Sequence, residues 1–147
     1  MTRRPVIINR TDDLGAALAI RAAVFIDEQG VSLADEVDGL DPDCIHWLAT
    51  DAEGPVATLR VMDVTPEEGP RTAKIQRVAV LPRARGTGLG AILMRDVLED
   101  LQAEGYVRAI LGAQSQVTGF YEALGFAAHG PTYDDAGIPH QDMTREL

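Results

Sequence analysis

The stretch that decides the fold is Lys74–Met94, KIQRVAVLPRARGTGLGAILM, in which an apolar strand leads through a basic, glycine-rich turn into an apolar helix. The strand covers Ile75–Val80 and stops before Pro82, and the turn runs from Arg83 to Gly90. A helix N-terminus carries unpaired backbone N–H groups and the positive end of the helix dipole. The loop therefore suits a phosphate group, which glycines allow to approach the backbone closely.

The glycine spacing separates this loop from the common nucleotide-binding motifs. A P-loop requires Gly-Lys-Ser/Thr after four intervening residues, and the dinucleotide fingerprint requires G-x-G-x-x-G. The chain has Gly86, Gly88 and Gly90 with Leu93 in the last fingerprint position, so neither motif fits. What fits is R-x-x-G-x-G, which begins at Arg85 directly after the strand. The alternative is a glycine-rich turn that only joins a strand to a helix.

Length and composition favour one soluble globular domain. The 147 residues are enough for one domain with a core and too few for two comfortable ones, so we expect a single domain over residues 1–147. No apolar run reaches membrane-spanning length, and the short Val6–Ile8 run is no signal-peptide core. A cytoplasmic protein is expected, and the single Cys44, which cannot form an internal disulfide, agrees with this.

The charges are segregated along the chain. The formal net charge of −10 argues against nucleic acid as a partner. Residues 22–59, the acidic stretch, contain no Lys or Arg but nine carboxylates: Asp27, Glu28, Asp35, Glu36, Asp38, Asp41, Asp43, Asp51 and Glu53. Residues 69–95, the basic stretch, contain six Lys and Arg residues and no carboxylate. We expect an anionic cofactor to bind the basic stretch and a cationic acceptor to bind the acidic stretch. The alternative is that the carboxylates only form a solvated face.

The first half of the chain predicts mixed secondary structure. Apolar periodicity, capping residues and turn residues predict a short buried strand, a helix, a long loop with room for one short helix, and a β-hairpin. The strand covers Val6–Ile8 and the helix runs from Thr11 to about Phe25. The loop covers Asp27–Cys44, and the hairpin pairs His46–Thr50 with Val56–Val64. Loops as long as Asp27–Cys44 are usually functional in compact domains.

The second half predicts a crossover and a closing pair of strands. The helix after Gly88 continues to about Glu104, and a buried strand follows at Tyr106–Leu111. A strand, a helix and a strand of these lengths predict a parallel β-α-β unit. A short helix over Val117–Leu124 and strands at Phe126–His129 and Met143–Glu146 complete the chain.

Four motifs in order resemble the GCN5-related N-acetyltransferases (GNAT), in particular their ElaA-like branch. Besides the glycine loop they are the RAAVFIDEQ segment from Arg21, with acidic residues and His46 after it, the AQ…FYEALGF block that begins at Ala113, and DAGIPHQDM from Asp135. The resemblance covers most of the chain from Arg21 to Met143. It implies an α/β fold of the α+β type: a mixed, mostly antiparallel twisted sheet of about six or seven strands, with helices on both faces and a central β-α-β crossover that binds acyl-CoA.

The resemblance also implies the cofactor and its contacts. Acetyl-CoA would be the acetyl donor, its pantetheine arm paired with the end of the central strand and its pyrophosphate held by the loop. The implied cofactor-binding residues are Val78, Ala79, Val80, Arg83, Arg85, Gly86, Thr87, Gly88, Leu89, Gly90, Gln114, Phe120 and Tyr121. Gln114 stands where the wider family more often has Asn, which keeps the amide but lengthens its reach.

Three residues are candidates for the chemistry of amine acetylation. Tyr121 matches the tyrosine that the family uses near the thioester sulfur, and a phenol with a pKa near ~10 can donate a proton to the leaving thiolate; its alternative role is that of a core aromatic residue. An acceptor amine with a pKa near ~10.4 must lose a proton before attack. Lys74–Val78 contains no carboxylate where many relatives have a glutamate, so Glu28 and His140 are the candidate bases, each with a structural hydrogen bond as its alternative role.

The cysteine and the histidines give little evidence for a thiol nucleophile or a metal site. Cys44 and His46 would share a strand face without a third partner, which disfavours a thiol nucleophile. The three histidines lack metal-ligand spacing, so no metal is predicted. The sequence thus predicts an N-acetyltransferase that acts on a primary amine of a small-molecule or peptide acceptor, with a non-catalytic acyl-CoA-binding or sensing module as the alternative. No oligomeric state is predicted.

Overall fold

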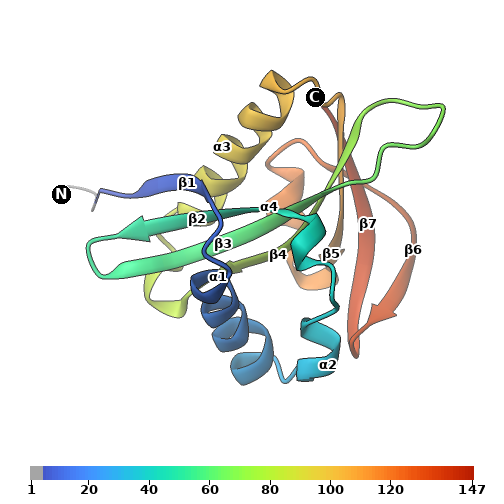
Figure 1. Cartoon of the computed structure of the whole chain (residues 1–147). Coiled ribbons are helices and arrows are strands. Elements are labelled where there is room, and N and C mark those ends of the chain that lie inside the picture. Colours follow the sequence, from blue (N-terminus) through green and yellow to red (C-terminus); the bar gives the residue numbers. More distant parts are fainter. Residues whose placement is uncertain (1–4) are drawn as a thin grey trace. The chain divides into compact units, whose positions relative to one another are not determined.

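The computed structural model describes residues 5–147, which contain four α-helices and seven strands (Figure 1). The helices are α1 (Leu14–Arg21), α2 (Leu33–Glu36), α3 (Leu89–Ala103) and α4 (Thr118–Glu122). The strands are β1 (Ile7–Thr11), β2 (Ile45–Asp51), β3 (Gly54–Asp63), β4 (Thr72–Val80), β5 (Arg108–Gln114), β6 (Ala127–Asp135) and β7 (Ile138–Glu146). None of the helices described combines the length and the apolar character needed to cross a bilayer.

The strands hydrogen bond in the order β1-β2-β3-β4-β5-β7-β6. β1 pairs antiparallel with β2, and β7 pairs antiparallel with both β5 and β6. β4 and β5 are parallel, with Thr72 opposite Arg108 and Lys74 opposite Ile110. The expected mixed, mostly antiparallel sheet of about six or seven strands and the expected parallel crossover through α3 are therefore confirmed.

The chain divides into two compact units. One contains Met1–Arg60 and Arg77–Leu93, and the other contains Val61–Gln76 and Met94–Leu147. In the first unit, buried Ala17, Ile20 and Val24 pack in one cluster with Leu48 of β2 and Ala79 of β4. These three helical residues recur at the spacing of one helix face, as expected for a helix that packs against a core.

The first helix begins as predicted and ends later. The side chain of Asp13 accepts a hydrogen bond of 3.0 Å from the backbone N–H of Ala16, which caps α1. After Arg21 the chain continues as a π-helical segment, Ala22–Glu28, instead of ending near Phe25. π-helical turns are rare and occur mostly at functional sites. The acidic stretch therefore starts inside a helix.

The outer strands differ from the prediction in burial and length. Ile7 of β1 is 63% exposed, so the expectation of a buried first strand is wrong. β6 and β7 are each nine residues long and form a long hairpin (Figure 1), where the sequence predicted two shorter strands. Every residue of β6 is exposed, so no apolar alternation marks this strand in the sequence.

Candidate functional site

The glycine loop presents open backbone at the start of α3. β4 ends at Val80, a single 3₁₀ turn follows over Pro82–Ala84, and α3 begins at Leu89. Gly86 and Gly88 have φ values of +78° and +82°, which side chains disfavour, and an added Cβ at either position would meet nothing within 4 Å. The loop is therefore bare on its outer side, next to the unpaired N–H groups of the first helical turn.

Two arginines of the same loop already hold carboxylates. Arg85 forms a forked pair with Glu28, with Nη1 2.5 Å from Oε2 and Nη2 2.6 Å from Oε1. Arg83 donates from Nη1 to Asp51 Oδ2 at 2.7 Å and to Glu53 Oε2 at 2.8 Å. The hydrogen bond from Arg85 lowers the pKa of Glu28. Arg83 also donates from Nη2 to Asp51 Oδ1 at 3.1 Å, so each of the two guanidinium groups binds one carboxylate through two nitrogens.

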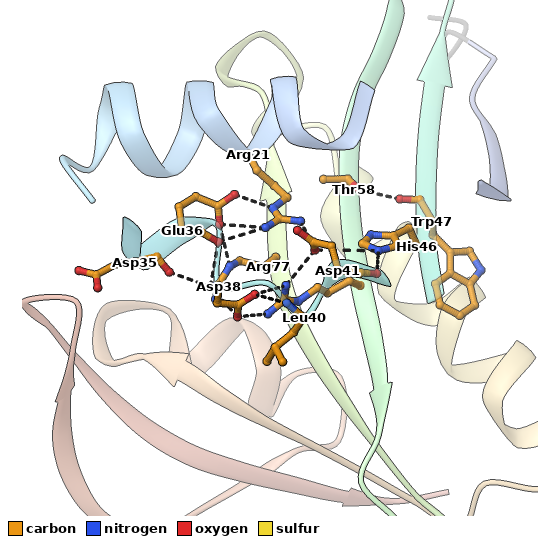
Figure 2. A network of polar contacts seen from close by, with 11 residues as sticks. Arg21, Asp35, Glu36, Asp38, Leu40, Asp41, His46, Trp47, Thr58 and Arg77 are labelled. Atoms are coloured by element: carbon orange, nitrogen blue, oxygen red, sulfur yellow. Dashed lines mark hydrogen bonds and ion pairs between the residues drawn. The ribbon is translucent and has the colours of Figure 1, made fainter. Parts of the chain in front are cut away.

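Part of the acidic stretch forms a network with arginines (Figure 2). The network consists of Arg21, Arg60 and Arg77 with Glu36, Asp38 and Asp41. Because these residues come from α1, α2, β3, β4 and the chain that follows α2, the network fixes the loop that the sequence predicted as functional. The loop is held by charge pairs rather than by an apolar core.

The centre of this network is buried. Glu36 Oε1 lies 2.7 Å from Arg21 Nε, and these side chains are 2% and 1% exposed. The Arg60 side chain is fully buried and donates to Asp38 and Asp41. Hydrogen bonds from Arg60 lower the pKa of Asp38, and although burial alone would raise the pKa of Asp41, hydrogen bonds from Arg21 and Arg60 lower it. Buried charges of this kind persist only when every partner is present.

Arg77 connects the network to an irregular point in β4. Its φ of +57° lies in the left-handed region, which a non-glycine side chain rarely adopts within a strand. Its Nε donates to Glu36 Oε2 at 2.7 Å. Such a backbone conformation costs about 1–3 kcal/mol and persists where surrounding contacts impose it. The ion pair with Glu36 is one such contact, and it acts one residue before Val78.

In the second unit, Tyr121 lies in an aromatic cluster. It is 8% exposed, and its ring meets those of Phe120 and Phe126 edge to face, with centroid distances of 5.0 and 6.0 Å. Burial raises the pKa of Tyr121 to about 12. The phenol is therefore neutral at physiological pH and can act as a hydrogen-bond or proton donor.

His140 and Gln114 face each other across β5 and β7. The two residues are partners in the strand register. His140 Nδ1 lies 2.7 Å from the carbonyl oxygen of Ile138, and because a carbonyl can only accept, Nδ1 carries the proton of the neutral ring. No hydrogen bond within residues 5–147 reaches Nε2 of His140, so this nitrogen keeps its lone pair available.

The structure brings four of the predicted site residues together as two pairs, which the sequence did not predict. Glu28 meets Arg85 in the first unit, and Gln114 meets His140 in the second. Sequence reasoning missed Asp51 and Glu53 as partners of the loop, because pairs about thirty residues apart leave no local signal. Within residues 5–147 no group of three metal-ligating side chains is present, and burial raises the pKa of the Cys44 thiol.

Comparisons with known proteins identify the class of fold and the family. The model of the acetyltransferase (GNAT) domain family matches residues 23–147. The chain therefore belongs to the GNAT acetyltransferase family and is an acyl-CoA-dependent N-acetyltransferase.

Relatives confirm the expected ElaA-like branch. The chain is 38% identical over 138 residues to YyaT of Bacillus subtilis, which covers 92% of this chain and 90% of YyaT. It is 34% identical over 136 residues to ElaA of Escherichia coli, which covers 91% of this chain and 88% of ElaA. The crystal structure of E. coli ElaA matches with a TM-score of 0.80 at 30% identity, over 98% of this chain and 100% of that one. An acyl-CoA N-acyltransferase from Pseudomonas aeruginosa matches with a TM-score of 0.80 at 32% identity, over 96% and 99% of the two chains.

Proposed function

We propose that this chain transfers the acetyl group of acetyl-CoA to a primary amine of a small-molecule or peptide acceptor, by direct attack in a ternary complex. The observation that carries the proposal is the bare glycine loop at the N-terminus of α3, flanked by arginines whose forks are oriented toward anions. Backbone N–H groups at a helix start together with two guanidinium groups suit a pyrophosphate.

The loop residues have separate roles in holding the cofactor. The backbone of Val78–Val80 pairs with the pantetheine arm as an added strand would, and the backbone from Gly86 to Gly90 receives the pyrophosphate. Leu89 is buried, so it contributes its backbone N–H and not its side chain. The carboxylates of Asp51 and Glu28 now accept hydrogen bonds from Arg83 and Arg85. When the cofactor binds, its pyrophosphate oxygens replace these carboxylates at the two guanidinium groups. Gln114, Phe120 and Tyr121 remain further residues that we propose to contact the cofactor.

The proton transfers follow from the states of His140 and Tyr121. The acceptor arrives as an ammonium ion, and His140 Nε2 takes one proton from it, which frees the nitrogen lone pair. The amine then attacks the acetyl carbonyl carbon, the carbon–sulfur bond breaks, and Tyr121 donates its proton to the departing thiolate. The second ammonium proton, released when the amide forms, restores the Tyr121 phenol directly or through water.

Between the two candidate bases, the contacts favour His140. The Glu28 carboxylate is engaged by Arg85 and its pKa is lowered, which makes it a weaker base. His140 has a fixed tautomer with an available Nε2. Glu28 acquires a catalytic role only if cofactor binding releases it from Arg85.

The experiment that tests the cofactor site measures binding of acetyl-CoA. Wild-type protein should be stabilised against heat by acetyl-CoA, because a ligand that binds only the folded state raises its stability. Gly88→Val places a branched side chain at a φ of +82° on the bare side of the loop and should abolish this stabilisation. Gly30→Val is the matched control, with a φ of +73° and equally open surroundings outside the loop. Equal stabilisation of all three proteins would contradict the proposed site.

A further inference from the structure

Strands β6 and β7 of the second unit bring a phenol, an imidazole and a carboxylate onto one face, beside β5. The register places Gln114, His140 and Tyr133 in one row across β5, β7 and β6, and it places Gly112 opposite Asp142. The Tyr133 ring stacks on the His140 ring, with a centroid distance of 6.0 Å and an interplanar angle of 24°. Tyr133 Oη donates to Asp142 Oδ1 at 2.7 Å.

Gly112 leaves the space that this arrangement needs. A Cβ added at Gly112 would lie 2.4 Å from Tyr133 Oη and 3.8 Å from Asp142 Oδ1. The Tyr133 hydroxyl therefore lies directly over the backbone of β5, where any side chain would displace it. The three side chains and Gln114 share this face, because residues two apart in a strand point the same way.

Asp142 differs from most carboxylates of the acidic stretch, because no ion pair joins it to an arginine, lysine or histidine among residues 5–147. Six of the nine carboxylates of that stretch accept from arginines: Glu28, Glu36, Asp38, Asp41, Asp51 and Glu53. Asp142 is exposed and, among residues 5–147, receives only the Tyr133 hydroxyl, on Oδ1. Among residues 5–147 no hydrogen bond reaches its Oδ2, and His129, its register partner on β6, contacts Thr144 instead.

The Tyr133 hydroxyl holds the carboxylate without competing for the cation. Partial desolvation and the hydrogen bond with Asp142 raise the pKa of Tyr133 to about 12, so the phenol stays a donor at neutral pH. A donor that fixes one carboxylate oxygen leaves the other oriented for a second partner. The stacked ring of Tyr133 fixes the imidazole of His140 at the same time.

We propose that Asp142 binds the ammonium group of the acceptor and presents it to His140, with Tyr133 as the positioning residue for both. This inference rests on the proposed acetyl transfer. Residues two apart along a strand are about 6.8 Å apart. An ammonium nitrogen that hydrogen bonds to both Asp142 and His140 at about 2.9 Å can bridge polar atoms up to about 5.8 Å apart. The two side chains reach this separation if they lean toward each other. The substrate class is thus an unhindered primary amine, whose reacting nitrogen must enter between a carboxylate and an imidazole.

The test uses three primary amines as probes: n-butylamine, 1,4-diaminobutane and Nα-acetyl-lysine amide. Their dissociation constants are measured by calorimetry for wild-type protein, Asp142→Asn and Glu146→Gln. Asn at 142 retains an oxygen for the Tyr133 hydroxyl but loses the charge, so we expect affinity for the bound amines to fall about tenfold. Glu146→Gln removes the same charge from an exposed position of the same strand and should stay within twofold of wild type.

Initial rates separate this inference from the proposed function. With acetyl-CoA saturating, Asp142→Asn should raise KM for the amine about tenfold and change kcat little, whereas Tyr133→Phe should raise KM and also lower kcat through His140. Equal amine affinity in wild type and Asp142→Asn, or no binding of any probe to wild type, overturns the inference. Binding that depends on Asp142 without any release of thiol overturns the proposed acetyl transfer and leaves the ammonium subsite standing.

Discussion

Replacing Glu36 by Gln tests the buried network with a magnitude that the structure sets. Glu36 accepts from Arg21 Nε at 2.7 Å, from Arg21 Nη2 at 3.1 Å and from Arg77 Nε at 2.7 Å. Breaking a buried ion pair by removing one partner costs about 3–5 kcal/mol, since the remaining charge stays buried. Asp41 still accepts from Arg21 Nη1, which points to the lower end of that range.

A loss of about 3 kcal/mol should lower Tm by roughly 6–12 °C in a chain of this size. Denaturant unfolding followed by the fluorescence of Trp47, which is 1% exposed and lies in the same unit, measures the loss directly. Glu53→Gln is the matched control, because Glu53 pairs with Arg83 at the surface and exposed pairs contribute little. If both variants unfold at the wild-type denaturant concentration, the network does not stabilise the fold as argued.

Three further predictions concern catalysis, cofactor affinity and pH. Tyr121→Phe should lower kcat at least a hundredfold and leave KM for acetyl-CoA within about twofold, because it removes the acid and keeps the ring; steady-state kinetics decide, and an unchanged kcat rejects Tyr121 as the acid. Glu28→Gln should tighten acetyl-CoA binding several-fold in calorimetry by freeing Arg85, and weaker binding would show that Glu28 supports the site instead. The hydrogen bond from Arg60 lowers the pKa of Asp38 in the folded state, so ionised Asp38 stabilises the fold. This stabilisation is complete above the pKa of Asp in the unfolded chain, about 3.9, and is lost as pH falls from there through the pKa of the folded state. Tm should therefore drop more between pH 4 and pH 3 in wild type than in Asp38→Asn.

The sequence was informative where local geometry imposes a residue type. Gly86 and Gly88 adopt positive φ values that favour glycine, so the position of the loop could be predicted from its residue types. The parallel pairing of β4 and β5 followed from the lengths of the strand, helix and strand, since only a crossover joins such strands.

Long-range charge pairing could not be predicted in the same way. Arg77 and Glu36 are 41 residues apart, and Arg85 and Glu28 are 57 apart. The segregation of charge along the chain suggested two separate partners, but in the first unit Arg77, Arg83 and Arg85 of the basic stretch pair with five carboxylates of the acidic stretch. We therefore propose that the cationic acceptor binds at Asp142 and not at the acidic stretch.

The C-terminal hairpin escaped prediction for a different reason. Gly130 and Pro131 in β6 and Pro139 in β7 are residues that strands disfavour, and β6 buries no side chain. Its register shift between His129 and Tyr133 accommodates the glycine and the proline. The DAGIPH motif from Asp135 thus forms the turn of the hairpin and the start of β7, and it brings His140 beside Tyr133.

The most direct test of the central claim is the release of free coenzyme A thiol from acetyl-CoA in the presence of a panel of primary amines. Wild-type protein should release thiol with at least one amine, in equal amount to the N-acetylated amine detected by mass spectrometry, and His140→Asn should release it at least a hundredfold more slowly. Binding of acetyl-CoA without thiol release for any amine would contradict acetyl transfer and would support a non-catalytic acyl-CoA-binding module.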